Sequence, residues 1–182
     1  MIRKMFALVA IVACSSLAMS AEIKSGPQNG EKVPGPFTPL NINGENACKK
    51  ACLYCKHGDS PVAVVFARTS TCEQATKLIE KLDAETGKNT KAEMGFYVVF
   101  LSDDDKLEGD LKKMIEGKKL KNVTLSIDSP KGPEKYALDK DADVTVLLYK
   151  ERKVEANYAF SKGKLTDKDI DTIVGDVSKI VK

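Results

Sequence analysis

The 182-residue chain has no tryptophan, and His57 is its only histidine. A single histidine cannot form a multi-histidine metal site, and it leaves little scope for histidine-based catalysis. The formal net charge is only +3, and lysines alternate with acidic residues along the chain, so we expect no basic face for nucleic acid. After residue 13 no apolar run is long enough to span a bilayer. The composition that remains, with 42% hydrophobic and 30% charged residues, suits one globular domain.

Residues 1–20 have the pattern of a secretory signal peptide. Two of the net positive charges, Arg3 and Lys4, precede a short apolar run, and small residues follow it up to Ala21. We expect cleavage after residue 20 or 21 and export to the periplasm or the outside of the cell. Cys14 offers an alternative, because the sequence IVAC that ends on it resembles the lipobox of bacterial lipoproteins. In that case a lipid on Cys14 would anchor the protein to the membrane.

The rest of the chain divides into an irregular lead-in at 21–60, which ends in a cysteine-rich loop, and a regular domain at 61–182. In the second part, apolar runs typical of strands alternate with helical patterns. Ser70 is the predicted N-cap of the first helix, in a capping box with Glu73, and Gly87 is its predicted end. The predicted strands are 61–67, 95–101, 123–127, 144–149 and 154–160, with helices at 70–87, 107–117 and 166–181. This order predicts an α/β fold with a parallel sheet centre and an antiparallel hairpin at one edge.

Several segments also follow the order and spacing of a known superfamily. They are Gly30–Phe37, Thr69 with Cys72, the strand at 98–103, the segment 133–138, and the strand beginning at Val144. With them the chain resembles the thioredoxin-like superfamily, and within it the redoxin and peroxiredoxin branch. The resemblance implies a thioredoxin-like fold, with a central mixed sheet flanked by helices and a C-terminal hairpin and helix.

The chain departs from this family at positions that carry its activities. Peroxiredoxins have a proline four residues before the threonine, where this chain has Val65, and no arginine stands at 141–144. Thioredoxins have a cis-proline where this chain has Val144, and a cysteine where it has Thr69. Because of these departures, the resemblance does not imply the peroxidase activity or the thioredoxin activity for this chain.

Cys72 is a candidate nucleophile. We expect it in the first turn of a helix, where unpaired N–H groups and the helix dipole stabilise a thiolate, with Arg68 adding positive charge. Thr69 accompanies it at the family's spacing. The alternative is a buried cysteine that takes no part in chemistry.

Cys52 and Cys55 form a Cys-x-x-Cys pair, a spacing used for dithiol exchange. Lys56 and His57 follow the pair and can carry positive charge. The pair precedes the strand at 61–67, whereas the family's active site follows it, so we expect about 20 Å between them. The pair could also be a staple of the loop, or it could bind zinc together with Cys48 and His57.

An even number of cysteines outside the signal segment favours disulfides in an exported chain. Cys48, Cys52, Cys55 and Cys72 are the candidates, and they allow three connectivities. The first hypothesis is an exported thiol–disulfide oxidoreductase with Cys52 and Cys55 as its redox pair and Cys72 as a further thiol. Its partners would be protein thiols and disulfides or a protein of the cell envelope. We predict no cofactor and no metal, no nucleic acid, and membrane contact only through a lipid on Cys14.

The second hypothesis is a non-catalytic thioredoxin-fold module of the envelope whose disulfides staple the lead-in. A peroxidase at Cys72 ranks below both, because its proline and arginine helpers are missing.

Overall fold

Two nearly continuous apolar segments after the predicted signal peptide form the centre of the sheet. In the computed structural model, which describes residues 23–69 and 72–182, they are β3 (Val62–Ala67) and β4 (Gly95–Leu101). Every residue of both strands is buried, and the strands run parallel. β5 (Val123–Asp128) continues the parallel order beside β4, and β6 (Val144–Lys150) runs antiparallel on the other side of β3. A run without alternation is what a strand covered on both faces requires.

The two edges of the sheet are antiparallel. β7 (Lys153–Phe160) pairs with β6 through a tight turn, and β1 (Leu40–Asn41) pairs with β5 and with β2 (Lys49–Lys50). Among the described residues the order is β2-β1-β5-β4-β3-β6-β7. The predicted α/β fold, with a parallel centre and an antiparallel hairpin edge, is confirmed. β1 and β2 were not predicted, because two-residue strands with the sequences LN and KK have no detectable alternation.

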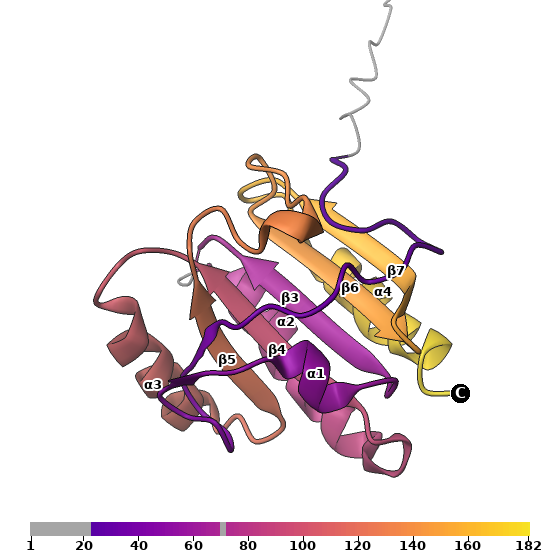
Figure 1. The fold of residues 1–182 in the computed structure, drawn as a ribbon, viewed down its shortest axis with the longest axis horizontal. Coiled ribbons are helices and arrows are strands. Elements are labelled where there is room, and N and C mark those ends of the chain that lie inside the picture. Colours follow the sequence, from indigo (N-terminus) through magenta and orange to yellow (C-terminus); the bar gives the residue numbers. More distant parts are fainter. Residues whose placement is uncertain (1–22, 70–71) are drawn as a thin grey trace, which may run out of the picture.

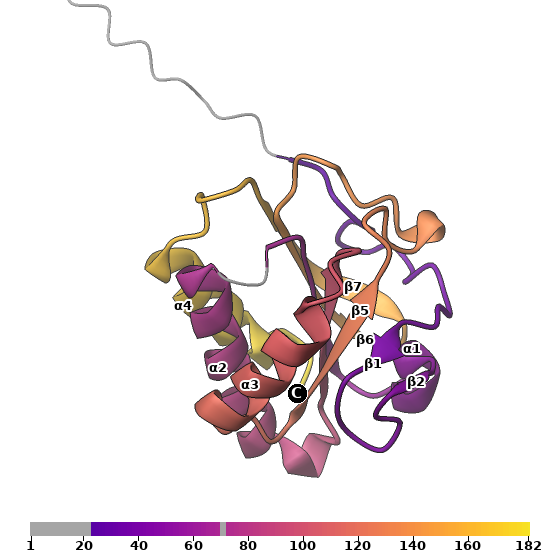
Figure 2. The same ribbon diagram turned by 90° about the vertical axis from the view of Figure 1, so that its left-hand side faces the viewer.

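The helices lie on both faces of the sheet (Figures 1 and 2). α2 (Glu73–Lys88), α3 (Leu107–Lys118) and α4 (Asp167–Asp176) cover one face. The short α1 (Leu53–His57) and the lead-in cover the other face. Short 3-10 turns follow or precede the main elements at Thr90–Ala92, Glu134–Tyr136 and Val177–Lys179. No helix in the described ranges is long and apolar enough to cross a membrane.

Alternate residues of β3 enter two separate cores. Ala63, Val65 and Ala67 belong to the helix-side core, which they share with residues of α2, α3 and α4. Val62, Val64 and Phe66 belong to the α1-side core, which also contains Leu53 and Tyr54 of α1. Because side chains alternate along a strand, neighbouring residues of β3 pack in different cores, on opposite faces of the sheet.

The lead-in is tied to the edge of the sheet by backbone hydrogen bonds. The amides of Gly30 and Val33 donate to the carbonyls of Val154 and Arg152, both at 2.8 Å, and Val154 donates to Glu31 at 2.9 Å. Residues 23–39 are irregular, as expected, but the rest of the predicted lead-in is not, because β1, β2 and α1 lie within it. The segment packs on the same sheet as the rest of the chain.

The start and the end of α2 differ from the prediction. The helix begins at Glu73 with Cys72 as its N-cap, so Ser70, which lies outside the described residues, is not the cap. Gly87 does not end the helix, which continues to Lys88. A Cβ at Gly87 would lie 2.9 Å from Nδ2 of Asn122, so close packing explains this glycine. The last helix agrees with its prediction, because Thr166 caps α4 in a capping box with Asp169.

Candidate redox site

Cys52 and Cys55 form a disulfide, with 5.3 Å between their Cα atoms. Cys52 has an extended backbone and is the N-cap of α1, and its Sγ accepts a hydrogen bond from the amide of Cys55 at 3.0 Å. Helix geometry explains which side chains face the sheet, because successive residues lie about 100° apart. Leu53, Tyr54 and His57 fall on one side and contact the sheet, and Cys55 falls opposite them, on the solvent side.

Aromatic rings fill the space between α1 and the sheet. Tyr54, Tyr97 and Tyr149 are all buried, and the hydroxyls of Tyr97 and Tyr149 lie 3.5 Å apart. Burial raises the pKa of Tyr97 and raises that of Tyr149 to about 12, so these two phenols are protonated at neutral pH. This cluster forms a rigid apolar base for the helix that carries the disulfide.

The turn between β6 and β7 holds α1 from the side. The guanidinium of Arg152 lies 5.4 Å from the centre of the Tyr54 ring, and its Nε pairs with the Asp59 carboxylate at 3.0 Å. The amide of Glu151 donates to the carbonyl of Asp59 at 3.0 Å. Both turn residues have positive φ, as this two-residue connection requires. We did not foresee this contact, because the turn lies almost a hundred residues from Tyr54 in the sequence.

His57 is not a cationic neighbour of the disulfide at neutral pH. Burial, and to a smaller extent the charge of Lys56, lowers the pKa of its imidazole from 6.5 to about 4. The ring is stacked on Tyr97 and lies above Gly95, where a Cβ would come within 2.3 Å of Nδ1. The expectation that His57 adds positive charge is therefore wrong, and its role here is packing. Lys56 is exposed and pairs with Glu45 at 3.5 Å.

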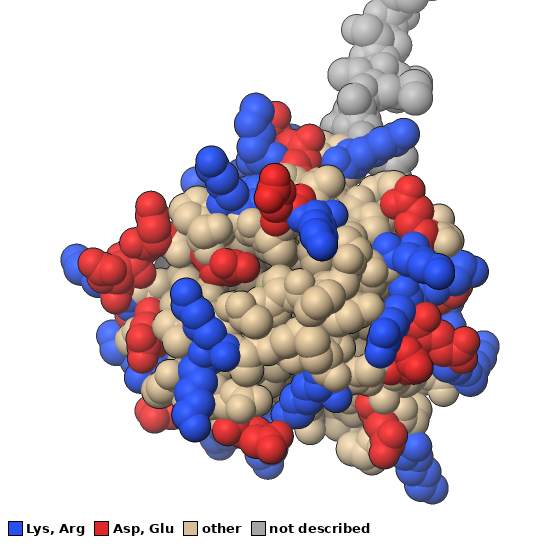
Figure 3. All heavy atoms as spheres, viewed as in Figure 1, with Lys and Arg blue, Asp and Glu red and all other residues tan. Residues whose placement is uncertain are grey.

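The face that carries α1 is weakly charged near its middle. Figure 3 shows a broad area without Lys, Arg, Asp or Glu, surrounded by charged side chains of both signs. The lead-in segment 34–40 crosses this face and contains no charged residue (Figure 1). A contact made on this area would therefore desolvate no charged side chain.

Cys72 lies on the other side of the sheet. Its half-buried side chain packs against the helix-side core, whereas Cys52 packs against the α1-side core. Cys72 also follows the C-terminal end of β3, and α1 lies over the N-terminal halves of β3 and β4 (Figure 1). The sheet therefore separates Cys72 from the Cys52–Cys55 pair. The sequence predicted that they lie at opposite ends of the strand, and their placement on opposite faces was not predicted.

The hydrogen bonds of the Arg68 and Thr69 side chains go to groups other than the Cys72 thiol. The guanidinium of Arg68 donates to the carbonyls of Pro130, Asp139 and Ala142, so it ties two loops together. The hydroxyl of Thr69 donates to the carboxylate of Asp143, which is largely buried, at 2.6 Å. The charge of Arg68 at Cys72 stays a prediction, since the hydrogen bonds of the guanidinium go to three carbonyl groups.

Cys48 is free and exposed, at the turn that leads into β2, and Cys72 is also free. The predicted zinc alternative does not match the arrangement, since Cys52 and Cys55 are bonded to each other and His57 packs on Tyr97. No group of three or more His, Cys, Asp or Glu side chains in the described ranges could hold a metal ion. The lipidation candidate Cys14 lies outside the described residues.

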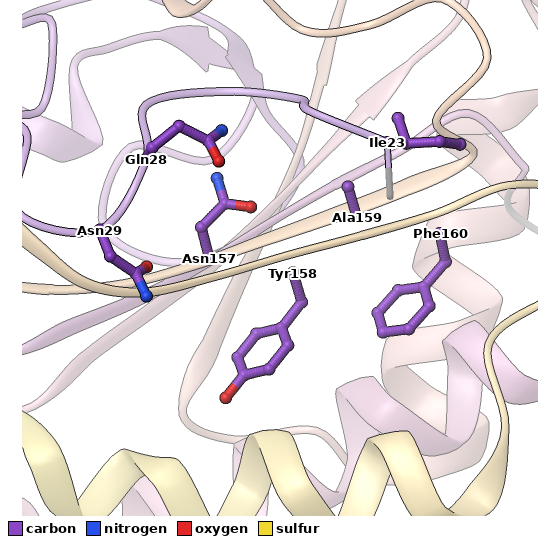
Figure 4. Close-up of a pocket in the computed structure, with 7 residues that line it drawn as sticks. All are labelled: Ile23, Gln28, Asn29, Asn157, Tyr158, Ala159 and Phe160. Atoms are coloured by element: carbon purple, nitrogen blue, oxygen red, sulfur yellow. The ribbon is translucent and has the colours of Figure 1, made fainter. Parts of the chain in front are cut away.

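A cavity of about 420 Å³ lies along β7, and none of the residues that line it is a cysteine (Figure 4). Tyr158 and Phe160 point toward α4, and Asn157 and Ala159 lie on the lead-in side. The side-chain amide of Asn157 donates to the carbonyls of Ser25 and Pro27, and the Tyr158 hydroxyl bonds to the Asp176 carboxylate. Its polar groups thus hold the lead-in and α4 in place.

No protein-family profile and no curated protein sequence matches this chain, but solved structures do. The thioredoxin domain of a thiol-disulfide oxidoreductase from Bacteroides vulgatus matches with a TM-score of 0.58 and 17% identity, over 83% of this chain and 99% of that one. The peroxidoxin BcpB from Mycobacterium tuberculosis matches with a TM-score of 0.60 and 15% identity, over 87% and 99%. The chain has a thioredoxin-like fold. The fold that the resemblance implied is thereby confirmed.

A third structure with this thioredoxin-like fold is a secreted disulfide oxidoreductase from Mycobacterium tuberculosis, homologous to DsbE of E. coli. It matches with a TM-score of 0.58 and 14% identity, over 79% of this chain and 95% of that one. The fold is thus shared by oxidoreductases and by a peroxidoxin. At such identities it does not choose between disulfide exchange and peroxide chemistry, so the choice depends on the cysteines themselves.

Proposed function

We propose that the chain is an exported thiol–disulfide oxidoreductase that acts on the thiols or disulfides of other proteins through Cys52 and Cys55. One observation carries the proposal: the only disulfide among the described residues joins a Cys-x-x-Cys pair whose second cysteine is exposed to solvent. In the oxidising direction, a partner dithiol gives two electrons to the disulfide and becomes a disulfide itself. In the reducing direction the same atoms exchange in reverse, and the relative reduction potentials decide which direction dominates.

Export follows from the sequence pattern at residues 1–20 and agrees with the use of a disulfide, because disulfides persist in oxidising compartments. Mass spectrometry of the protein isolated from its cells tests this part. A mature N-terminus at residue 21 or 22 supports release, and a diacylglyceryl group on Cys14 supports anchoring. An intact Met1 in the isolated protein would contradict export.

The exchange activity is tested by insulin reduction and by equilibration with glutathione buffers. We expect Cys52→Ser and Cys55→Ser to abolish turnover, while Cys48→Ser and Cys72→Ser, the matched controls, leave it unchanged. A reduction potential well below about −300 mV would mark the bond as structural instead.

A non-catalytic module of the cell envelope is the second candidate. It is favoured by the position of the pair, which lies on the opposite face of the sheet from Cys72, where the family has its active cysteine. In that case Cys52→Ser lowers the melting temperature, and no exchange activity exists to be lost.

A further inference from the structure

The two sulfur atoms of the disulfide lie in different surroundings. Cys55 is exposed, because it falls on the side of α1 opposite Leu53 and Tyr54. Cys52 is half-buried, and its side chain packs against the α1-side core. A thiolate attacks a disulfide along the extension of the S–S bond, so it needs free space beyond the sulfur that it attacks. Solvent supplies this space at Cys55, and packed side chains restrict it at Cys52.

A hydrogen bond adds a second difference between the sulfurs. The backbone amide of Cys55 donates to Sγ of Cys52 at 3.0 Å. If the disulfide opens so that Cys52 leaves as a thiolate, this amide is already in place to stabilise the negative charge. Hydrogen bonds to charged acceptors are stronger than those to neutral ones, and a stabilised thiolate is the better leaving group.

We propose that Cys55 is the sulfur that partners attack, and that Cys52 is the leaving and resolving sulfur. This assignment rests on the proposed oxidoreductase function and assigns the polarity of its site. Accessibility and the hydrogen bond point the same way. Cys52 therefore bonds only to Cys55, and Cys55 forms the mixed disulfide with the partner.

The exchange then proceeds in two balanced steps. A partner thiolate forms a bond to Cys55 Sγ, the Cys52–Cys55 bond breaks, and Cys52 takes the electron pair as a thiolate. The partner's second thiolate then attacks its own sulfur in the mixed disulfide and releases the Cys55 thiolate. The partner loses two electrons and two protons, and the two cysteines gain them. In the reducing direction, Cys55 attacks the partner disulfide and Cys52 resolves the mixed disulfide.

The test uses the full chain with Cys48→Ser and Cys72→Ser, so that only the pair remains. Cys52→Ser and Cys55→Ser are added separately, and each remaining thiol is reacted with oxidised glutathione. We expect Cys55, in the Cys52→Ser protein, to form its glutathione adduct at least about tenfold faster than Cys52 does in the Cys55→Ser protein. In urea, which removes the packing, the two rates should converge.

A second measurement uses the intact pair. The oxidised protein is mixed with limiting reduced glutathione, quenched in acid, alkylated and mapped by mass spectrometry. Glutathione on Cys55 with the alkyl group on Cys52 supports the assignment, and the reverse pattern overturns it while leaving the proposed function intact. A rate difference that persists in urea also overturns it, because the fold would then not be its cause. If glutathione at any ratio leaves the pair oxidised, both the proposed function and this assignment fail.

Discussion

The imidazole of His57 lies parallel to the ring of Tyr97, with 6.0 Å between the ring centroids. The imidazole is neutral in the folded protein at neutral pH, since its pKa is lowered to about 4. In the unfolded chain the pKa of the imidazole returns to about 6.5. Between these values the unfolded state binds more protons, so the free energy of unfolding falls as the pH falls from about 6.5 toward 4. From pH 7 to pH 4.5 we expect the loss due to His57 to be about 2 kcal/mol.

Denaturant unfolding followed by circular dichroism at several pH values measures this loss. His57 is the only histidine, so His57→Gln should remove this part of the pH dependence while leaving that of the carboxylates. Equal slopes in the two proteins between pH 6.5 and pH 4.5 would show that His57 is not protected in the folded state.

Gly95 allows the close approach of His57 to β4. A Cβ at this position would lie 2.3 Å from Nδ1 and 2.5 Å from Cε1 of His57. We expect Gly95→Ala to lower the free energy of unfolding by about 1–3 kcal/mol through overpacking. Gly109→Ala is the matched control, because it lies inside α3 with no heavy atom within 4 Å of its Cβ. Loss of glycine from an open helix position should stabilise the protein by about 0.5–1 kcal/mol.

The cost of Gly95→Ala should depend on the imidazole. Without the imidazole the clash is gone, so Gly95→Ala should cost much less in the His57→Ala background than in the unchanged chain. Additive effects in the double-mutant cycle would mean that the strain lies elsewhere.

Asp83 joins α2 to the start of β5. Its largely buried carboxylate accepts hydrogen bonds from the amides of Asn122 at 2.7 Å, Val123 at 2.9 Å and Lys121 at 3.1 Å. Asp83→Ala leaves these donors without their acceptor, and we expect a loss of about 3 kcal/mol and a melting temperature lower by about 10 °C. Asp110→Ala on the exposed face of α3 removes only a surface pair with Lys113 and should change stability by less than about 0.5 kcal/mol. Similar effects of the two substitutions would contradict the role of Asp83.

The strands and long helices could be predicted because their signals are local. Every residue of the segment at 95–101 is apolar or glycine, and Thr166 with Asp169 marks the start of α4 within one turn. The N-cap of α2 was predicted two residues too early, at Ser70, since Ser70 and Glu73 have the pattern of a capping box, whereas Cys72 with its extended backbone is the cap. Gly87 is the typical residue for a helix end, but here its contact with Asn122, distant in sequence, explains it.

The candidate site was predictable only in part. The Cys52–Cys55 pair follows from its spacing, but α1 was not predicted, so the exposure of Cys55 opposite Leu53 and Tyr54 was not predicted either. The neutral state of His57 is not implied, because it arises from burial against Tyr97, whose position depends on the register of β4. The contact of Arg152 with Tyr54 depends likewise on the pairing of β6 and β7, which no local pattern defines.

The thiol states of the four cysteines give a further prediction. Alkylation of the denatured but unreduced protein should label Cys48 and Cys72, and only reduction should expose Cys52 and Cys55 to the reagent. In the native protein Cys48 should react faster than Cys72, because Cys48 is exposed and Cys72 is half-buried against the helix-side core. Cys48→Ser should remove the fast phase and leave the slow one. A Cys48–Cys72 linked peptide in the digest would contradict this arrangement, since both thiols are free in the structure.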